Sequence, residues 1–383
     1  MNYDIVIIGG GMVGQAFALS MAKTNSKIAI IEPNNPNPIL GDAHHTRVSA
    51  ITPTSEKLLK NIGAWDLIKR KHAFANTSVW DQNSHGSLDF HAQDESLDHL
   101  GHIIENDVIQ SALFTALEKT NIEFISAKLD SIEKTHEGYQ VTVDINQTLD
   151  CQLLIGADGA RSRVRDLASI EFSENNYQQK AIVCNIKSLQ GFKDTTWQRF
   201  LSDSIIALLP LSEHQASIVW SAENTLADEL MQLSKEAFAK RLSAGVEYRF
   251  GEFELVSDIQ AFPLIERSAK DYVQENLALI GDAAHNIHPL AGQGVNLGFS
   301  DIIELSQQLQ SSSKPLGDYS TLRNYARARR LDNELMAKTM TGLNWIYKEN
   351  NEPLRWLRGF GMNIINENPT LKSFLQKHAL GNS

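Results

Sequence analysis

A glycine-rich turn between two apolar runs restricts the fold of this chain more than any other feature. Residues 4–8 predict a buried strand, residues 16–21 a helix, and residues 27–31 a second strand. The turn before the helix has the G-x-G-x-x-G spacing, which permits a tight turn and a close approach of backbone to a pyrophosphate. Glu32 follows the second strand, where a carboxylate binds a ribose diol. The pattern therefore predicts a βαβ unit that binds a dinucleotide, and its glycines are Gly9, Gly11 and Gly14.

A second glycine-rich segment lies late in the chain. Residues 277–280 predict a strand that stops before Asp282, whose carboxylate is placed to accept hydrogen bonds from hydroxyls. Pro289 ends regular structure, and Gly292 and Gly294 leave the start of the next helix almost without side chains. Such a helix start offers unpaired N–H groups and a positive dipole end to a ligand. The segment suits a flavin, which has a polyol chain and a ring that becomes anionic on reduction; an ordinary strand–loop–helix is the alternative.

A third segment combines a short strand with an acidic turn and a basic helix start. Residues 153–155 are apolar, Asp158 and Gly159 follow, and the three arginines come next at positions 161, 163 and 165. Alone, this pattern would indicate a β-turn with Asp-Gly at its tip. Beside the other two segments, we interpret it as a further part of the cofactor site.

Together the three segments resemble the single-component (class A) flavoprotein aromatic hydroxylases, the group typified by para-hydroxybenzoate hydroxylase. The resemblance implies that Asp158 and Gly159 contact both FAD and NAD(P)H, that Asp282 holds the FAD ribityl chain, and that Arg47 is the arginine of an early cofactor-contacting loop. It identifies no base that deprotonates the substrate; His288, close to the flavin loop in sequence, is the one candidate. The cofactor-binding residues that it implies are Gly9, Gly11, Val13, Gly14, Glu32, Arg47, Gln110, Asp158, Gly159, Gly281, Asp282, Pro289, Gly292, Gln293, Gly294, Val295 and Asn296.

Further segments are similar to the ubiquinone-biosynthesis hydroxylases. The likeness implies an FAD-dependent monooxygenase that uses NAD(P)H and O2, through a flavin C4a-hydroperoxide, to hydroxylate a polyprenylated phenol. Residues 47–51 and 100–106 look closest to the enzyme that hydroxylates C5 of the polyprenylphenol ring. The segments that carry the likeness are residues 47–51, 55–59, 63–65, 99–106, 288–299, 354–361 and 378–381.

The expected fold is α/β: a Rossmann-like, discontinuous FAD-binding domain, a β-sheet substrate domain and C-terminal helices. The three glycine and acid motifs must converge on one FAD, which assigns residues 1–70, 100–175 and 272–315 to the first domain. Residues 71–99 and 176–271 form the second, and residues 316–383 the C-terminal helical region. The strands expected in the second domain are residues 77–80, 87–90, 180–186, 205–211 and 216–221. The candidates to line its pocket, with plain core as the alternative for each, are Leu209, Pro210, Trp220, Phe262 and Pro263.

Composition and charge limit the partners. A net charge of −11 argues against nucleic acid. The two cysteines, Cys151 and Cys184, fit a reducing compartment rather than a disulfide scaffold. A strand from residue 4 leaves no room for a signal peptide, and no apolar run reaches the roughly 18–20 residues of a spanning helix. The sequence therefore predicts a cytoplasmic protein, or one peripheral on the inner face of the membrane.

The C-terminal region differs in charge from the rest. From Arg323 onward the chain contains ten basic and five acidic residues, and the same region carries Trp345, Trp356 and Phe360. Basic residues beside aromatic ones are typical of a helix on an anionic membrane surface. A helical cap packed on the core is the alternative, and docking of other quinone-biosynthesis proteins is a further use of such a region.

Two other interpretations of the chain follow from the same residues. One is an FAD-dependent reductase or oxidase that acts on isoprenoid lipids; the other is a non-catalytic flavoprotein subunit of a quinone-biosynthesis assembly. The adjacent His44 and His45 suggest a metal, but no second cluster at ligand spacing accompanies them, so no metal site is expected.

Overall fold

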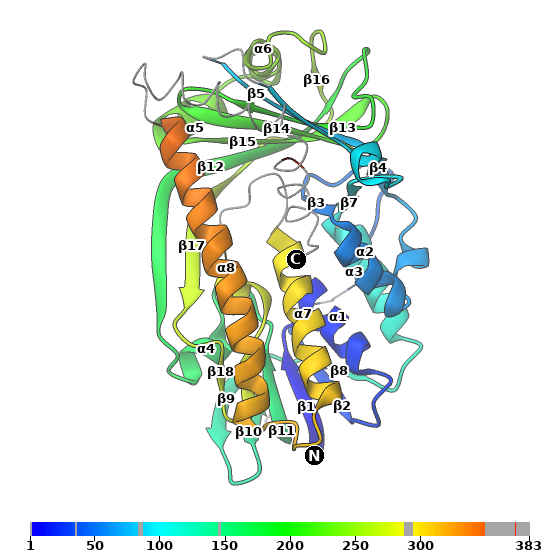
Figure 1. Cartoon of the computed structure of the whole chain (residues 1–383), viewed down its shortest axis with the longest axis vertical. Helices are drawn as coiled ribbons and strands as arrows, with labels where there is room; N and C mark the ends of the chain where they lie inside the picture. Colours follow the sequence, from blue (N-terminus) through cyan, green and yellow to red (C-terminus); the bar gives the residue numbers. More distant parts are fainter. Residues whose placement is uncertain are drawn as a thin grey trace.

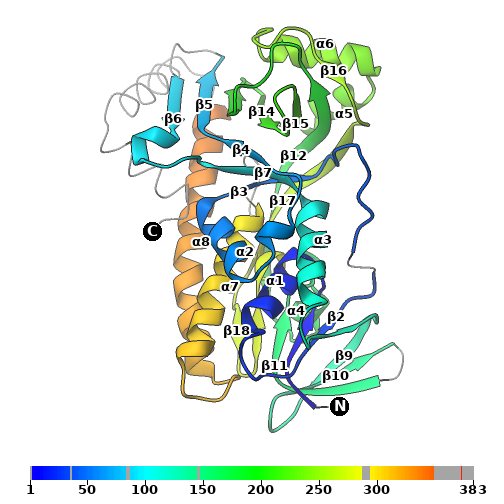
Figure 2. The ribbon, with the colours of Figure 1, turned by 90° about the vertical axis from the view of Figure 1, so that its right-hand side faces the viewer.

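The protein consists of two lobes stacked along its long axis (Figure 1). The structure is a computed structural model that describes residues 2–34, 37–82, 87–144, 147–286, 294–348 and 372, with only the backbone of residues 334–348. A sheet of eight strands forms the lower lobe, a sheet of nine forms most of the upper lobe, and a sheet of three lies between them (Figure 2). This arrangement confirms the expected α/β fold class.

The lower sheet is built on a parallel core. Its main strand order is β18-β19-β11-β1-β2-β8, with β10 beside β11 and β9 beside β10. β1 lies between β2 and β11 and is parallel to both, while β19 is parallel to β11. The strands are β1 (Asn2–Ile8), β2 (Ile28–Ile31), β8 (Glu123–Ile125), β9 (Leu129–Lys134), β10 (Tyr139–Val143), β11 (Gln147–Gly156), β18 (Val273–Gln274) and β19 (Leu277–Leu279). Segments far apart in the chain therefore form one sheet.

Helices cover this sheet and bury its central strands. Every residue from Ile5 to Ile8 is buried, as a central parallel strand requires. α1 contacts both α3 and α7, and α7 packs against α8, which runs along most of the molecule in Figure 1. The helices of this lobe are α1 (Met12–Met21), α2 (Pro53–Asn61), α3 (Asn106–Leu117), α4 (Arg163–Leu167), α7 (Gly294–Ser311) and α8 (Tyr319–Lys348).

The upper sheet has the order β20-β17-β12-β15-β14-β13-β5-β6, with β16 beside β12. On one face, Leu208 and Trp220 belong to a core that includes α5 and α6; on the other, Leu209 and Val219 face the small sheet. The strands are β5 (Asn76–Asp81), β6 (Ser87–His91), β12 (Phe172–Lys187), β13 (Thr195–Phe200), β14 (Ser204–Pro210), β15 (Gln215–Glu223), β16 (Glu254–Leu255), β17 (Gln260–Ala269) and β20 (His285–Asn286). Each of the five expected strands lies within or largely overlaps one of these.

The small sheet separates the lobes. It contains β3 (Val48–Ile51), β7 (Gly101–Glu105) and β4 (His72–Phe74), with β7 in the middle and antiparallel to both neighbours. Ala50 and Ile103 pack with Leu209 and Leu211 of the upper lobe. An apolar layer therefore joins the small sheet to the inner face of the upper sheet.

Two long strands connect the lobes. β12 and β17 pair antiparallel from Phe172 opposite Ala269 to Val183 opposite Gln260, and the register shifts between Asn176 and Lys180. Figure 1 shows both strands running from the lower lobe into the upper sheet. The lobes are thus joined by a continuous two-stranded ribbon that contains one irregularity.

Some features differ from what the sequence indicated. The helices α5 (Asn224–Met231) and α6 (Lys235–Gly245) were not expected within the upper lobe. Arg329, counted among the basic residues of the tail, is buried instead of facing a surface. Among the described helices, none combines the length and apolar character needed to cross a membrane.

Candidate functional site

Four turns meet at one edge of the lower sheet because the strands before them are parallel and in register. Ile8 of β1 lies opposite both Ile31 of β2 and Gly156 of β11, and Gly156 lies opposite Leu279 of β19. The segments that follow these strand ends contain the motifs found in the sequence. Parallel strands end at the same edge, where open α/β sheets bind their ligands. The structure therefore brings the glycine turn, Glu32, Asp158 and the 281–282 turn together.

The glycine turn leaves space for a ligand at only one of its three positions. Gly9 has φ +110°, and a Cβ there would lie 2.3 Å from the carbonyl oxygen of Ala157. A Cβ on Gly14 would lie 2.0 Å from the Gly9 oxygen, whereas a Cβ on Gly11 would meet no atom within 4 Å. Gly11 is the N-cap of α1, and no side chain caps that helix. The free N–H groups and the open space fit a pyrophosphate.

Glu32 supports the glycine turn. Its Oε2 accepts the backbone N–H of Gly10 at 2.9 Å, and its Oε1 accepts the backbone and side-chain N–H groups of Asn34, each at 3.0 Å. Sequence reasoning assigned only a ribose contact to this residue. The ribose contact stays a prediction, and the structure adds that Glu32 fixes the turn.

The turn at Gly281 contacts the glycine turn directly. Gly281 has φ +59°, and a Cβ there would lie 3.1 Å from Cγ1 of Val13. The side chain of Asp282 is exposed, and Asn286 donates to it at 3.2 Å. Desolvation by the surrounding protein raises the pKa of Asp282, while the charges of His285 and Arg47 act to lower it. The Asp282 carboxylate thus lies in the site with capacity to accept hydroxyl donors.

A buried ionic network holds this turn from behind. Oδ2 of Asp301 accepts the Gly281 N–H at 2.8 Å and lies 2.6 Å from Nε2 of His285, while Nε of Arg329 donates to Oδ1 at 2.8 Å. Burial alone would raise the pKa of Asp301, but His285 and Arg329 outweigh burial and lower it. Sequence reasoning missed this network, since its members come from a turn, the short strand β20 and two helices.

Asp158 accepts hydrogen bonds from the start of α4. Its carboxylate accepts the Ser162 hydroxyl at 2.6 Å and the backbone N–H groups of Arg163 and Val164 at 2.6 and 3.1 Å. Gly159 has φ +80° and open space where a side chain would be. The predicted contacts of Asp158 and Gly159 with FAD and NAD(P)H stay predictions; the structure shows that Asp158 orders α4.

Arg165, two residues further on than Arg163, ties this motif to the 281–285 segment. Its guanidinium donates to the backbone oxygens of Ala283 and Ala160, both at 3.1 Å, and lies 4.2 Å from the ring centroid of Phe172. Arg165 is almost fully buried. It therefore serves the packing of the site, whereas Arg161 and Arg163 are exposed.

Asn296 joins α7 to the small sheet and α2. Its amide donates to the Ala50 oxygen at 2.7 Å, and its Oδ1 accepts from the Ser55 hydroxyl at 2.7 Å and the Thr52 N–H at 3.2 Å. The side chain of Asn296 is therefore engaged within the protein. Its predicted contact with the cofactor stays a prediction, and the backbone N–H at the start of α7 is the group left to make it.

Arg47 lies at the junction between the lobes. It is exposed, directly precedes β3, and its guanidinium carbon is 5.8 Å from the ring centroid of Phe262 on β17. Phe262 and Pro263 are both exposed, but Trp220 is buried against Phe238 of α6, so Trp220 is core and lines no pocket on this side. Leu209 and Pro210 are also buried.

The remaining predicted residues fall into two groups. Gln110 on α3 and Val295 on α7 are half-buried, and Gly294 begins α7 with open space around it. The residues that lie outside the described part of the chain are His288, Pro289, Gly292 and Gln293.

His44 and His45, the other pair singled out in the sequence, contact acidic side chains. Nδ1 of His44 lies 3.1 Å from Glu105, and Nε2 of His45 lies 3.7 Å from Asp107. Arg70 also pairs with Glu105, at 2.9 Å. An arginine and a histidine therefore already share the Glu105 carboxylate.

The parallel sheet, the uncapped helix start and the two acids define a dinucleotide-binding α/β protein. The profile of the family described as FAD binding domain matches residues 2–339, and the chain belongs to this family. A 3-demethoxyubiquinol 3-hydroxylase of Escherichia coli is 34% identical over 387 residues, covering 99% of this chain and 98% of the relative. The mitochondrial ubiquinone biosynthesis monooxygenase COQ6 of Homo sapiens is 33% identical, covering 98% of this chain and 92% of the relative.

Solved structures share the fold. A probable FAD-dependent monooxygenase of Pseudomonas aeruginosa, pqsL, has a TM-score of 0.78 at 19% identity and covers 94% of this chain and all of its own. The p-nitrophenol 4-monooxygenase PnpA of Pseudomonas putida has a TM-score of 0.78 at 18% identity, covering 100% of this chain and 99% of its own. The protein is an FAD-dependent monooxygenase with NAD(P)H as co-substrate, and neither a reductase nor a non-catalytic subunit is favoured.

Proposed function

We propose that this protein hydroxylates the aromatic ring of a polyprenylated phenol in ubiquinone biosynthesis, with NAD(P)H and O2. The observation that carries the proposal is the end-to-end likeness to the Escherichia coli relative, at 34% identity over 99% of this chain. A likeness over both lobes includes the parts that would bind substrate as well as those that bind cofactor.

Bound FAD supplies the transfer of electrons from NAD(P)H and the activation of O2. We assign the pyrophosphate to the N-terminus of α1, the ribose to Glu32 and the ribityl chain to Asp282. Backbone N–H groups at the start of α7 would face the ring and favour its anionic reduced form by preorganised electrostatics. The division of the chain into residues 1–70, 100–175 and 272–315 for FAD, and 71–99 and 176–271 for substrate, is part of the same proposal.

The apolar layer between the lobes supports the substrate assignment. Leu209 and Val219 of the upper sheet pack with Ala50 and Ile103 of the small sheet. Such a layer keeps water from the reacting ring, and water would release the activated oxygen unproductively. We place the edge of the aromatic site at Phe262, whose exposed ring lies beside Arg47.

The experiment that tests the reaction uses purified protein loaded with FAD. Oxidation of NAD(P)H should accelerate when a short-chain polyprenylphenol is added, and one oxygen atom from ¹⁸O2 should appear in the product. Turnover without incorporation of oxygen would refute hydroxylation and support a reductase or oxidase. For the ring position we infer C5; mass spectrometry of the quinone precursor in a deletion strain tests this, and accumulation of 3-demethoxyubiquinol would instead assign the 3-hydroxylation of the bacterial relative.

We also propose that the C-terminal region docks on the inner face of an anionic membrane. Arg323, Arg327 and Arg330 are exposed on α8. Beyond Lys348 only Lys372 lies in the described part of the chain, and its Nζ is 3.0 Å from Oδ2 of Asp94 in the upper lobe. Each Lys or Arg near an anionic surface contributes about 1 kcal/mol and is screened by salt.

Liposomes test the membrane proposal. Replacing Arg355 and Arg358 by Glu should reduce binding to anionic vesicles and turnover of a long-chain substrate, but spare a short-chain phenol. The control, with Lys23 and Lys128 replaced by Glu, makes the same change in charge on the exposed surface of the lower lobe. Equal activity of the Arg355/Arg358 variant on both substrates would refute membrane docking.

A further inference from the structure

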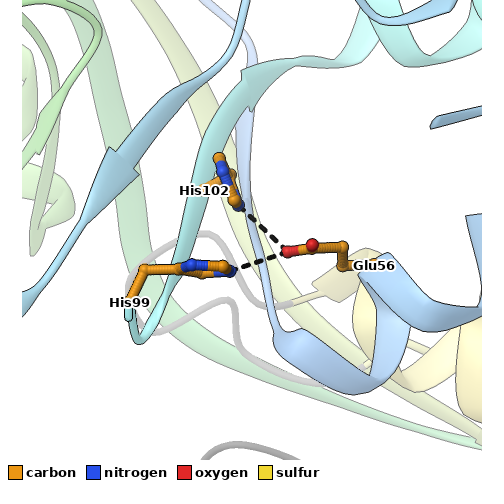
Figure 3. A group of neighbouring side chains, drawn as sticks. All are labelled: Glu56, His99 and His102. Atoms are coloured by element: carbon orange, nitrogen blue, oxygen red, sulfur yellow. Dashed lines mark hydrogen bonds and ion pairs between the residues drawn. The ribbon is translucent and has the colours of Figure 1, made fainter. Parts of the chain in front are cut away.

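A cluster of two histidines and one glutamate lies beside the proposed cofactor site, and Figure 3 shows its side chains converging. Nε2 of His99 is 2.8 Å from Oε2 of Glu56, and Nδ1 of His102 is 3.2 Å from the same oxygen. All three atoms lie within 4.8 Å of one another. Sequence reasoning expected no metal site, since Glu56 is more than forty residues away from the two histidines in the chain.

Rigid elements hold Glu56 and His102, whereas His99 lies in the loop just before β7. Glu56 is on α2, and its backbone N–H donates to the Thr52 oxygen at 2.8 Å. His102 is on the central strand of the small sheet, opposite Ile51 and Ala73, and the T-shaped contact of its ring with Trp65 has a centroid distance of 5.0 Å. The positions of the ligand-type atoms of Glu56 and His102 are therefore set by backbone hydrogen bonding and packing, as a preformed site requires.

The chemical state of the cluster suits a cation. Nδ1 of His102 is buried and makes no hydrogen bond of acceptable geometry with any described group. Lys60 donates to the other carboxylate oxygen of Glu56 at 2.6 Å and orients the carboxylate. An imidazole nitrogen without a good hydrogen bond and a carboxylate oxygen are both groups that ligate metals.

We propose that Glu56, His99 and His102 bind one divalent cation of the Zn²⁺ class. Zn²⁺ bonds of about 2.1 Å in a tetrahedral site place ligand atoms roughly 3.4 Å apart, close to the 2.8 and 3.2 Å separations of the two nitrogens from Glu56. Two imidazoles and a carboxylate select late first-row ions over Mg²⁺. The His99 side chain is 27% exposed, so an ion can enter the site from solvent. A water molecule can then occupy the remaining coordination position.

Neighbouring charges define the kind of site. Lys60 occupies one oxygen of Glu56, so the carboxylate binds through a single oxygen. Lys71 disfavours positive charge at His102 and therefore lowers the affinity of the site for the ion. The ion would join α2 to the small sheet. Because Ser55, next to Glu56, donates to Asn296 at 2.7 Å, this junction also supports the start of α7. The occupancy of the site is independent of the proposed hydroxylation.

Equilibrium dialysis of the chelator-treated, FAD-loaded full chain against Zn²⁺ tests the proposal, with bound metal measured by elemental analysis. We expect one Zn²⁺ per chain, no bound Mg²⁺ and a rise in melting temperature with Zn²⁺. His99→Gln and Glu56→Gln should each weaken Zn²⁺ binding by about tenfold or more, at least as much as the loss of an outer contact to a metal ligand. His99→Gln is the first choice because the side chain is partly exposed.

Two controls keep the outcome interpretable. His136→Gln removes an exposed histidine far from the cluster in sequence and should leave Zn²⁺ binding unchanged. His44→Gln with His45→Gln removes the other histidine pair. Absence of stoichiometric Zn²⁺ binding, binding retained in both His99→Gln and Glu56→Gln, or binding lost only in the His44/His45 variant would overturn the proposal. FAD content and the circular dichroism spectrum show whether each variant is folded, and the proposal is judged on the folded ones.

Discussion

Gly14→Ala should destabilise the lower lobe, whereas Gly11→Ala should leave the fold intact and impair cofactor binding. At Gly14 the added Cβ would lie 2.0 Å from the Gly9 oxygen, while ordinary contact begins at 3.4 Å. The obstacle is backbone, so α1 must move by about 1 Å or more relative to β1. Overpacking of this kind costs typically 1–3 kcal/mol, and the better helix propensity of alanine offsets at most about 1 kcal/mol.

The net cost at Gly14, taken from the middle of that range, is therefore about 1–2 kcal/mol of the free energy of unfolding. For a lobe of this size that corresponds to a fall in melting temperature of roughly 2–8 °C. At Gly11 the Cβ meets nothing within 4 Å, and φ −73° with ψ −175° is open to alanine. Its effect on unfolding should stay within about 0.5 kcal/mol. A methyl group between the helix start and the pyrophosphate should raise the Kd for FAD at least tenfold, about 1.4 kcal/mol.

Two measurements separate these effects. Urea unfolding of both apoproteins, followed by circular dichroism, reports the fold, and quenching of FAD fluorescence on titration reports the cofactor. The reasoning fails if Gly11→Ala binds FAD like the unchanged protein, or if Gly14→Ala unfolds at the same urea concentration as the unchanged protein.

Three further results are expected. Asp282→Ala should weaken FAD binding roughly ten- to a hundredfold, about 1.5–3 kcal/mol, through loss of a charge-assisted hydrogen bond, and unchanged affinity by fluorescence titration would show that the ribityl chain lies elsewhere. Arg329→Met leaves the Asp301 charge buried without its arginine and should cost about 3–5 kcal/mol in urea unfolding; a cost under 1 kcal/mol would contradict the network. The pKa of His102 falls from 6.5 to about 4 on folding, so the unfolded state takes up the proton first and stability should decrease as pH falls through this window. Urea unfolding at pH 7, 6 and 5 with chelator present measures that decrease, which His102→Gln should reduce and which an equal slope in both proteins would contradict.

The parts of the site that the sequence predicted are those encoded locally. The glycine turn, Glu32 and the 281–282 turn each follow a short apolar strand, and parallel pairing then places them at one edge. Local patterns also predicted β14, β15 and the second half of β12, residues 180–186, because each is rich in β-branched and apolar residues.

Contacts between distant segments could not be read in the same way. Arg329 looked like one more basic residue of the tail, and only the fold places it against Asp301, 28 positions earlier in the chain. Asp158 looked like a ligand contact, and its hydrogen bonds to the N-cap Ser162 and the first turn of α4 depend on the conformation of the turn. The helices α5 and α6 escaped notice because the strands around them dominated the pattern of that segment.

The ribbon of β12 and β17 limits how the two lobes can move against each other. The two strands pair on both sides of the register shift, from Phe172 to Asn176 and from Lys180 to Val183. Such a paired ribbon resists sliding of one strand along the other, so the lobes are more constrained than they would be on a single-chain linker. The flexible point is the register shift between Asn176 and Lys180, where Gln178 has φ +57°. Relative motion of the lobes is thus a bend or twist about this bulge.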